Sequence, residues 1–286
     1  MNTQKQSIGV HPKGEVEIRG SEPLVVETYG GRIHVEWNPH AEVTPLGQLP
    51  FFIDFLKTAE LFEPWVKDCP IKYSSPNAPS KHNILGTVLL SVLAGHKRYS
   101  HITTIRSDSV NPRLLGMKKV MSEDSVRRAF SNASEQSCRK WQQKHLQRCW
   151  ELLLYEPWIL DIDSTVKPLF GKQEGAVVGF NPHKPGRPSH VFHTYLIANL
   201  RLILDVEVQP GNQTAGKYAC SGLFEQIESL PPGARPALIR GDIGFGNETI
   251  MKEAEHKAVD YLFKIRQTKK VKCLVEALFR DGRWIN

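Results

Sequence analysis

The residues best suited to chemistry in this sequence are aspartates that end two short apolar runs. Asp161 and Asp163 lie two apart in PWILDIDST, and Asp242 ends ALIRGD. These runs are too short for typical helices and predict buried strands, on which residues two apart point to the same face. A carboxylate at the end of an apolar strand is costly unless it is paired, solvated or bound to metal. Capping of the following turn is the alternative role for either Asp163 or Asp242 alone.

The joint placement of Asp163 and Asp242 favours a shared metal site, with Asp161 as an auxiliary ligand. In sheets with helical crossovers, active sites gather at the carboxyl ends of strands. Hard divalent cations choose oxygen ligands. We therefore predict that Asp163 and Asp242 converge on one Mg²⁺ or Mn²⁺ site.

The elements expected to position these acids form an α/β mixed sheet in the C-terminal half of the chain. Apolar runs predict three consecutive strands, then a helix, a strand, a helix and a final strand, an order typical of a mixed sheet covered by helices. The predicted strands are 157–165, 189–200, 201–211, 237–242 and 259–265, and the predicted helices are 213–230 and 248–256.

The N-terminal half is predicted to be mainly α-helical, with a small hairpin around Gly30 and Gly31. Helices are expected within 50–68, from Ser80 to Gly95, from Ser122, and over 135–154. A short helix at 101–107 followed by the helix from Ser122 leaves two interpretations, a helix-turn-helix or a plain helical subdomain. The resulting division is 1–44 for the tail and hairpin, 45–155 for a basic helical region, and 156–286 for the sheet.

Positive charge is concentrated in that helical region. The 286-residue chain has a formal net charge of +7, and the window 97–148 alone holds twelve Lys and Arg against four acids, a net charge of +8. Such a segment favours a polyanion partner, nucleic acid first, although a solvated basic face is the alternative. The candidate DNA-binding residues are Arg127, Arg128, Lys140, Lys144 and Arg148 in the window, with Lys184 and Arg187 in the loop after the first acid.

Several other classes of protein are disfavoured. No run approaches the roughly 18 apolar residues of a membrane span, and no signal peptide is evident, so we expect a cytoplasmic, nucleoid-associated protein without a membrane partner. The five cysteines contain no CxxC pair, which argues against a disulfide framework. A zinc site at His183, His190, His193 and Cys220 is a weaker alternative, because the spacing matches no standard ligand pairing.

The segments LDIDSTVKPLFGKQEGAVVGFNPHKPGRPSH and IRGDIGFGNE together resemble the catalytic half of bacterial insertion-sequence transposases of the DDE type. The resemblance implies a ribonuclease H-like core, with Asp163 as the first metal-binding aspartate and Asp242 as the second. It further implies Mg²⁺-dependent or Mn²⁺-dependent cleavage and strand transfer at transposon ends. The implied partners are double-stranded DNA, as inverted-repeat ends and target, and a second copy in a dimer.

The sequence departs from this family at the third acid, a glutamate in a Tyr-x2-Arg-x3-Glu-x6-Lys signature. No such spacing follows Asp242, so we identify no third catalytic acid and expect a chain truncated before it, one that binds DNA without completing transposition. If the chain does complete strand transfer, Glu253 and Glu276 are the candidates for the third ligand. The alternatives are a catalytically inactive DNA-binding regulator derived from a transposase, and an unrelated divalent-metal nuclease using Asp163 and Asp242.

Overall fold

The structure is a computed structural model that describes residues 24–28, 31–35, 42–73, 75–213 and 215–283. The chain divides into two compact units, 1–133 and 134–286, which are described separately. Our prediction assigns the helix after Ser134 to the basic helical region, whereas the structure groups it with the sheet. Within the described residues, no helix is both long enough and apolar enough to cross a lipid bilayer.

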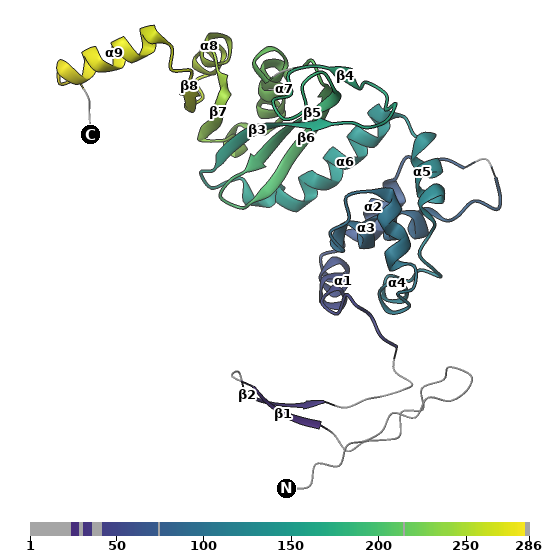
Figure 1. Cartoon of the computed structure of the whole chain (residues 1–286). Coiled ribbons are helices and arrows are strands. Elements are labelled where there is room, and N and C mark those ends of the chain that lie inside the picture. Colours follow the sequence, from purple (N-terminus) through teal and green to yellow (C-terminus); the bar gives the residue numbers. More distant parts are fainter. Residues whose placement is uncertain (1–23, 29–30, 36–41, 74, 214, 284–286) are drawn as a thin grey trace, which may run out of the picture. The chain divides into compact units, whose positions relative to one another are not determined.

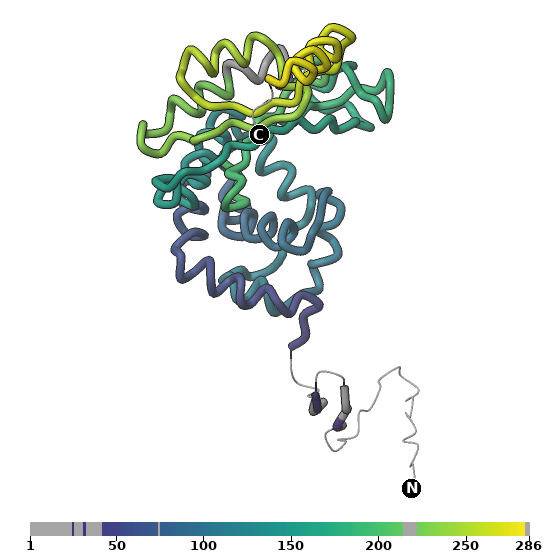
Figure 2. Tube along the Cα trace, turned by 90° about the vertical axis from the view of Figure 1, so that its left-hand side faces the viewer, coloured from purple at the N-terminus to yellow at the C-terminus, as the bar shows by residue number. Residues whose placement is uncertain are grey.

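Unit 1 begins with the predicted hairpin and continues as a cluster of short helices (Figure 2). The hairpin strands pair antiparallel with Thr28 opposite Gly31, while Gly30 lies outside the described residues. Gly31 adopts a φ of 117°, a conformation that favours glycine. The elements of this unit are β1 (Leu24–Thr28), β2 (Gly31–Val35), α1 (Leu49–Thr58), α2 (Phe62–Asp68), α3 (Lys81–Leu93), η1 (Tyr99–Ile105), α4 (Val110–Leu114) and α5 (Glu123–Ser131).

Two helix starts in unit 1 are confirmed and one predicted helix is wrong. The hydroxyls of Ser80 and Ser122 accept hydrogen bonds from the backbone N–H groups of Asn83 and Ser125, as N-caps do. The expected single helix within 50–68 is broken at Glu60, where φ is 52°. Pro64 explains the break, because it has no N–H to donate to the carbonyl four residues earlier.

The structure contradicts a helix-turn-helix made of the segment at 101–107 and the helix from Ser122. The segment predicted at 101–107 is the 3₁₀ helix η1, and α4 (Val110–Leu114) lies between it and α5 along the chain. The two helices are therefore not joined by the short turn that the motif requires.

Unit 2 contains the predicted mixed sheet with helices (Figure 1). The strand order is β6-β5-β3-β7-β8, with the short β4 also on β5; β3 pairs parallel with β7, and β7 with β8, while the other pairs are antiparallel. Its elements are α6 (Glu135–Trp150), η2 (Glu151–Leu153), β3 (Ile159–Pro168), β4 (Val177–Val178), β5 (Pro188–Ile197), β6 (Leu202–Pro210), α7 (Ala215–Ser229), η3 (Pro232–Ala234), β7 (Leu238–Gly246), α8 (Glu248–His256), β8 (Tyr261–Ile265) and α9 (Lys269–Arg280).

One face of this sheet, here called the core face, carries the hydrophobic core of unit 2. Leu160 and Ile162 of β3 and Ile239 of β7 are buried there against side chains of α7 and α8. Residues that alternate with these point to the opposite face, here called the open face. The open face leaves apolar side chains such as Leu262 of β8 60% exposed.

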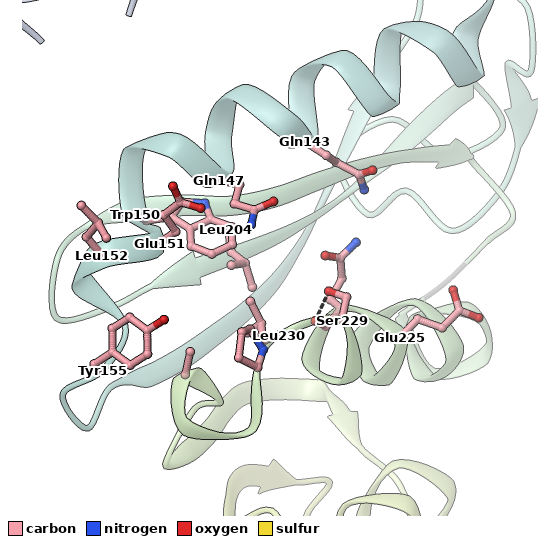
Figure 3. A pocket seen from close by; sticks show the side chains of 13 residues that line it. Gln143, Gln147, Trp150, Glu151, Leu152, Tyr155, Leu204, Glu225, Ser229 and Leu230 are labelled. Carbon is pink, nitrogen blue, oxygen red and sulfur yellow. Dashed lines mark hydrogen bonds between the residues drawn. The ribbon is translucent and has the colours of Figure 1, made fainter. Parts of the chain in front are cut away.

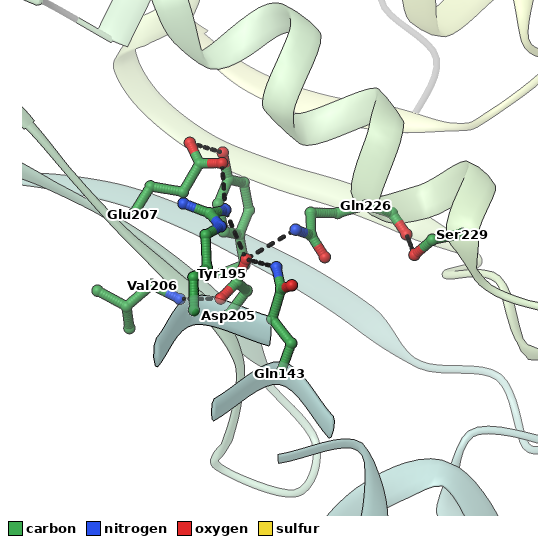
Figure 4. Close-up of polar contacts among 8 residues, drawn as sticks. Gln143, Tyr195, Asp205, Val206, Glu207, Gln226 and Ser229 are labelled. Carbon is green, nitrogen blue, oxygen red and sulfur yellow. Dashed lines mark hydrogen bonds and ion pairs between the residues drawn. The ribbon is translucent and has the colours of Figure 1, made fainter. Parts of the chain in front are cut away.

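Two acids on β6 are an exception to this apolar core. Asp205 and Glu207 are 3% and 9% exposed, and Arg139 of α6 donates from Nη2 to both, at 3.0 Å and 2.7 Å (Figure 4). Gln143 of α6 and Gln226 of α7 also donate to Asp205. Burial alone would lower the pKa of the Arg139 guanidinium, but the two carboxylates outweigh burial and raise it. The network therefore joins α6 and α7 to β6.

We predict that Arg139→Ala destabilises unit 2 by about 2 kcal/mol. Breaking a buried pair leaves uncompensated charge worth about 3–5 kcal/mol, and we expect less because the Arg139 side chain is 37% exposed. Urea unfolding followed through Trp150 and Trp158, which lie in the core of unit 2, measures the change. Arg148→Ala, an exposed arginine on the same helix, is the control, and equal effects of the two substitutions would contradict the prediction.

Candidate functional site

Asp163 and Asp242 lie at the end of a parallel ladder between two adjacent strands. The pairing of β3 with β7 runs from Ile159 opposite Leu238 to Ile162 opposite Gly241. Asp163 and Asp242 are the next residue on each strand. The prediction that the two strands lie side by side is confirmed. Both strands continue past the acids, to Pro168 and Gly246, so it is the ladder and not either strand that ends there.

Both acids are exposed, and backbone groups fix one oxygen of each. Asp163 Oδ1 accepts a hydrogen bond from the Ser164 N–H at 2.8 Å, and Asp242 Oδ1 accepts one from the Gly244 N–H at 2.9 Å. Among the described residues, neither Oδ2 accepts a hydrogen bond. Ile162 and Gly241 point to the core face, so the acids that follow them belong to the open face. Each carboxylate is thus oriented while keeping one oxygen for a ligand.

A bulge in β7 flanks this pair. The register with β8 shifts between Gly241 and Gly246, so the segment that begins with Asp242 is not paired with β8. A Cβ on Gly241 would lie 2.9 Å from Ile162 Cγ1, and one on Gly246 would lie 2.1 Å from the Lys264 carbonyl oxygen. Glycine is therefore required where the strands approach closely on both sides of the bulge. Bulges of this kind are common beside active sites, where they redirect a side chain.

The auxiliary acid Asp161 is held by an arginine that the sequence analysis did not identify. Asp161 is in register with Arg240 of β7. Arg240 donates from Nε to Oδ1 and from Nη2 to Oδ2, both at 2.6 Å, a bidentate ion pair. These bonds raise the pKa of the Arg240 guanidinium. Both oxygens of Asp161 are thus occupied, unlike those of Asp163 and Asp242.

No third acid joins the pair in the part of the chain that the structure describes. No group of three His, Cys, Asp or Glu residues there could hold a metal ion. Glu253 of α8 forms an ion pair with Lys257 at 3.2 Å. Glu276 lies on α9, outside the sheet.

The histidines of the alternative zinc site on β5 do not share a face of the sheet. His190 and His193 are three apart on β5 and so point to opposite faces. The His190 ring binds the Glu174 carbonyl oxygen, whereas His193 is buried on the core face. Burial lowers the pKa of His193, against an opposing effect of Glu207. The side chain of Cys220 lies outside the described residues.

The predicted DNA-binding residues fall on three elements, which belong to two units. Lys140, Lys144 and Arg148 are exposed along α6 in unit 2, whereas Arg127 and Arg128 are exposed on α5 in unit 1. The +8 window therefore spans both units and is not one patch within a single unit. Lys184 and Arg187 are exposed in the connection between β4 and β5.

A cavity elsewhere in unit 2 does not involve the acids. It measures about 400 Å³ and lies between the ends of α6 and α7, where Gln147, Trp150, Tyr155 and Ser229 line it (Figure 3). None of Asp161, Asp163 and Asp242 contributes to its lining.

The signals for the remaining features were partly present in the sequence. Arg240 stands two residues before Asp242, so strand alternation could have placed it on the open face.

The motif Gly-Phe-Asn-Pro forms a turn, in which the buried Asn181 accepts hydrogen bonds from the N–H groups of His183 and Lys184. That motif therefore has a structural explanation in this chain.

A family model described as "Transposase DDE domain group 1" matches residues 73–283, which include both acids of the pair. Among curated proteins, no sequence matches the chain significantly. Among solved structures, the piggyBac transposase synaptic complex with hairpin DNA is 14% identical, with a TM-score of 0.39, over 77% of this chain. The chain spans 51% of that protein's length.

The Mos1 transposase also appears among the similar structures. Its paired-end complex with the left transposon end is 11% identical, with a TM-score of 0.26, over 83% of this chain and 91% of that one. The Mos1 mariner paired-end complex with Mn is 12% identical, with a TM-score of 0.26, over 84% and 91%.

We predict that Mn²⁺ affinity depends on Asp163 and Asp242 and not on Asp161. Asp163→Asn or Asp242→Asn should weaken Mn²⁺ binding by about tenfold or more, since even partners outside the ligand shell cost 10–100-fold. The double variant Asp161→Asn/Arg240→Gln keeps the net charge and should change affinity by less than about threefold, because a solvent-exposed ion pair contributes little to stability. Titration followed by electron paramagnetic resonance measures free Mn²⁺. A loss in the double variant equal to that in Asp163→Asn would identify Asp161 as a ligand.

Proposed function

Because the chain belongs to the transposase DDE domain group 1 family, we propose that unit 2 cleaves and transfers DNA strands at the ends of a bacterial insertion sequence. The observation that carries this proposal is the position of Asp163 and Asp242 on adjacent parallel strands, each one residue beyond the last registered pair. Both acids are exposed, so a DNA phosphate would have access to them.

The residues present fit one divalent cation. Asp163 and Asp242 each keep one oxygen without a partner among the described residues, and Mg²⁺ is commonly bound by one or two carboxylates plus water. When bound, the ion supplies Lewis-acid stabilisation of negative charge on the reacting phosphate. The chain's own contribution is to fix the two carboxylates through the Ser164 and Gly244 N–H groups before DNA arrives.

We propose that the basic surfaces hold the DNA backbone. Lys140, Lys144 and Arg148 recur every four residues on one side of α6, which suits a run of phosphates. Lys184 and Arg187 follow the first acid in the chain and would contact phosphates nearer the site. In unit 1, Arg127 and Arg128 would add contacts from α5. A second copy of the chain would hold the other transposon end.

A second candidate function is supported by the two-acid site. Two-metal phosphoryl transfer uses ions about 3.5–4 Å apart, and the described residues contain no group of three or more His, Cys, Asp or Glu that could hold a metal ion. A protein with Asp163 and Asp242 alone would bind DNA and one cation and act as a regulator without completing strand transfer. Activity would require another carboxylate, with Glu253 and Glu276 as the sequence candidates.

One experiment separates these functions. Intact and pre-nicked inverted-repeat DNA is incubated with the full chain and Mg²⁺ or Mn²⁺, and products are resolved by denaturing electrophoresis. A transposase gives strand cleavage that Asp163→Asn and Asp242→Asn abolish, and Glu253→Gln and Glu276→Gln then identify any third ligand. Binding without cleavage supports the regulator, and cleavage that ignores the inverted repeats indicates an unrelated nuclease.

We predict that the α6 cations set the salt dependence of DNA binding. Each neutralised phosphate contributes about −0.9 to the slope of log affinity against log salt. Lys140→Gln/Lys144→Gln/Arg148→Gln should therefore make the slope shallower by up to about 2.7 and weaken binding to all sequences alike. Fluorescence anisotropy measured between roughly 50 and 300 mM KCl gives both the slope and the affinity. The control Lys57→Gln/Lys67→Gln removes exposed charges outside the basic window, and an equal change there would contradict the prediction.

A further inference from the structure

The connection between β3 and β5, residues 169–187, exposes aromatic side chains on a well-anchored loop. Phe170 and Phe180 are 71% and 70% exposed. The loop is tied to the rest of unit 2 by the Leu169 N–H bond to the Pro188 carbonyl and by the His190 bond to the Glu174 carbonyl. Large rings on an anchored loop present apolar area to water, which costs free energy unless a partner covers them.

Close backbone packing also restricts this loop. A Cβ on Gly179 would lie 1.8 Å from the Gly211 carbonyl oxygen, so residue 179 abuts the backbone after β6. Directly beyond it, the buried Asn181 side chain closes the turn that carries Lys184. Phe180 stands between these two anchors. Its ring is therefore presented by a backbone that is already organised.

The charge around the rings is positive. Lys172, Lys184 and Arg187 outnumber the single acid Glu174, giving the connection a net charge of +2. The Arg187 guanidinium lies 4.4 Å from the centre of the Phe170 ring, a cation–π pair. Aromatic rings and guanidinium planes among cations are the combination on which unpaired nucleobases stack.

The position of the loop relates it to the acids of the same unit. β3 runs from Asp163 to Pro168 before the loop begins, which is about 17 Å at roughly 3.3 Å per residue. That length corresponds to about five steps of duplex DNA at 3.4 Å per step. A strand with a phosphate at Asp163 and Asp242 could thus extend to the loop within a few nucleotides.

We propose that Phe170, Phe180 and Arg187 form a stacking platform for unpaired bases of DNA near the reacting end. This inference rests on the proposed function, since it names the state of the DNA that the site receives. The platform favours a duplex with a single-stranded tail over a fully paired duplex, because each base stacked on an aromatic side chain contributes about 1–3 kcal/mol. A protein partner covering the same rings is the competing occupant.

The test measures binding of the full chain, in EDTA, to a blunt duplex and to the same duplex with a six-nucleotide tail containing 2-aminopurine. The wild-type chain should bind the tailed DNA at least about fivefold more tightly and quench the 2-aminopurine fluorescence. Phe170→Leu and Phe180→Leu keep apolar area but lose the ring, and should remove both effects without changing affinity for the blunt duplex. Phe170→Tyr should retain them.

Controls distinguish the possible failures. Phe51→Leu and Phe279→Leu alter rings that are 80% and 74% exposed elsewhere, and should change nothing. Equal binding to the two DNAs, or quenching that survives in Phe170→Leu/Phe180→Leu, overturns the platform while leaving the proposed function intact. No binding to either DNA overturns both. A change in oligomeric state of the Phe variants by light scattering, without loss of tail preference, identifies a protein interface instead.

Discussion

The parallel pairing of β3 with β7 is the contact on which the candidate site depends. It joins residues 79 apart in sequence, as the Asp161–Arg240 pair shows. Because parallel strands cannot be joined by a tight turn, the pairing requires β4, β5, β6 and α7 to fold between them. Asp163 and Asp242 occupy neighbouring positions only when this long-range ladder forms.

Acids are buried and paired on one face of the sheet and exposed on the other. On β6, Asp205 and Glu207 point to the core face, where Arg139 pairs with both and two glutamines donate to Asp205. On β3, Asp163 points to the open face, where water or a cation can reach it. Burial without pairing is costly for a carboxylate. The buried Asp205 and Glu207 are therefore paired and join α6 and α7 to β6, whereas the exposed Asp163 and Asp242 remain available to a ligand. Exposure, rather than residue type, separates a structural acid from a candidate ligand here.

The sequence predicts the strands of the sheet but not which of their acids are buried. The apolar runs and turn residues predicted β3, β5, β6, β7 and α8 closely, since alternation and length are local properties. The segments LDVEV and LDIDS are nearly identical in pattern, and nothing local shows that one faces Arg139 and the other solvent. Helix α9 is not evident from the sequence because its lysines interrupt the apolar period at its start, whereas the break at Glu60 has a local signal in Pro64.

The Asp161–Arg240 pair shows how neighbouring residues of one motif can divide their roles. Asp161 and Asp163 share a strand, a face and a residue type, so spacing alone does not show which of them is the better ligand. Register decides between them: Asp161 lies opposite Arg240 within the ladder, whereas Asp163 lies beyond its last pair. An arginine fork satisfies both oxygens of the first carboxylate, and a single backbone N–H leaves one oxygen of the second. The end of the ladder thus determines which acid of the motif keeps an oxygen for a cation, and the Asp161–Arg240 pair lies within the ladder just before it.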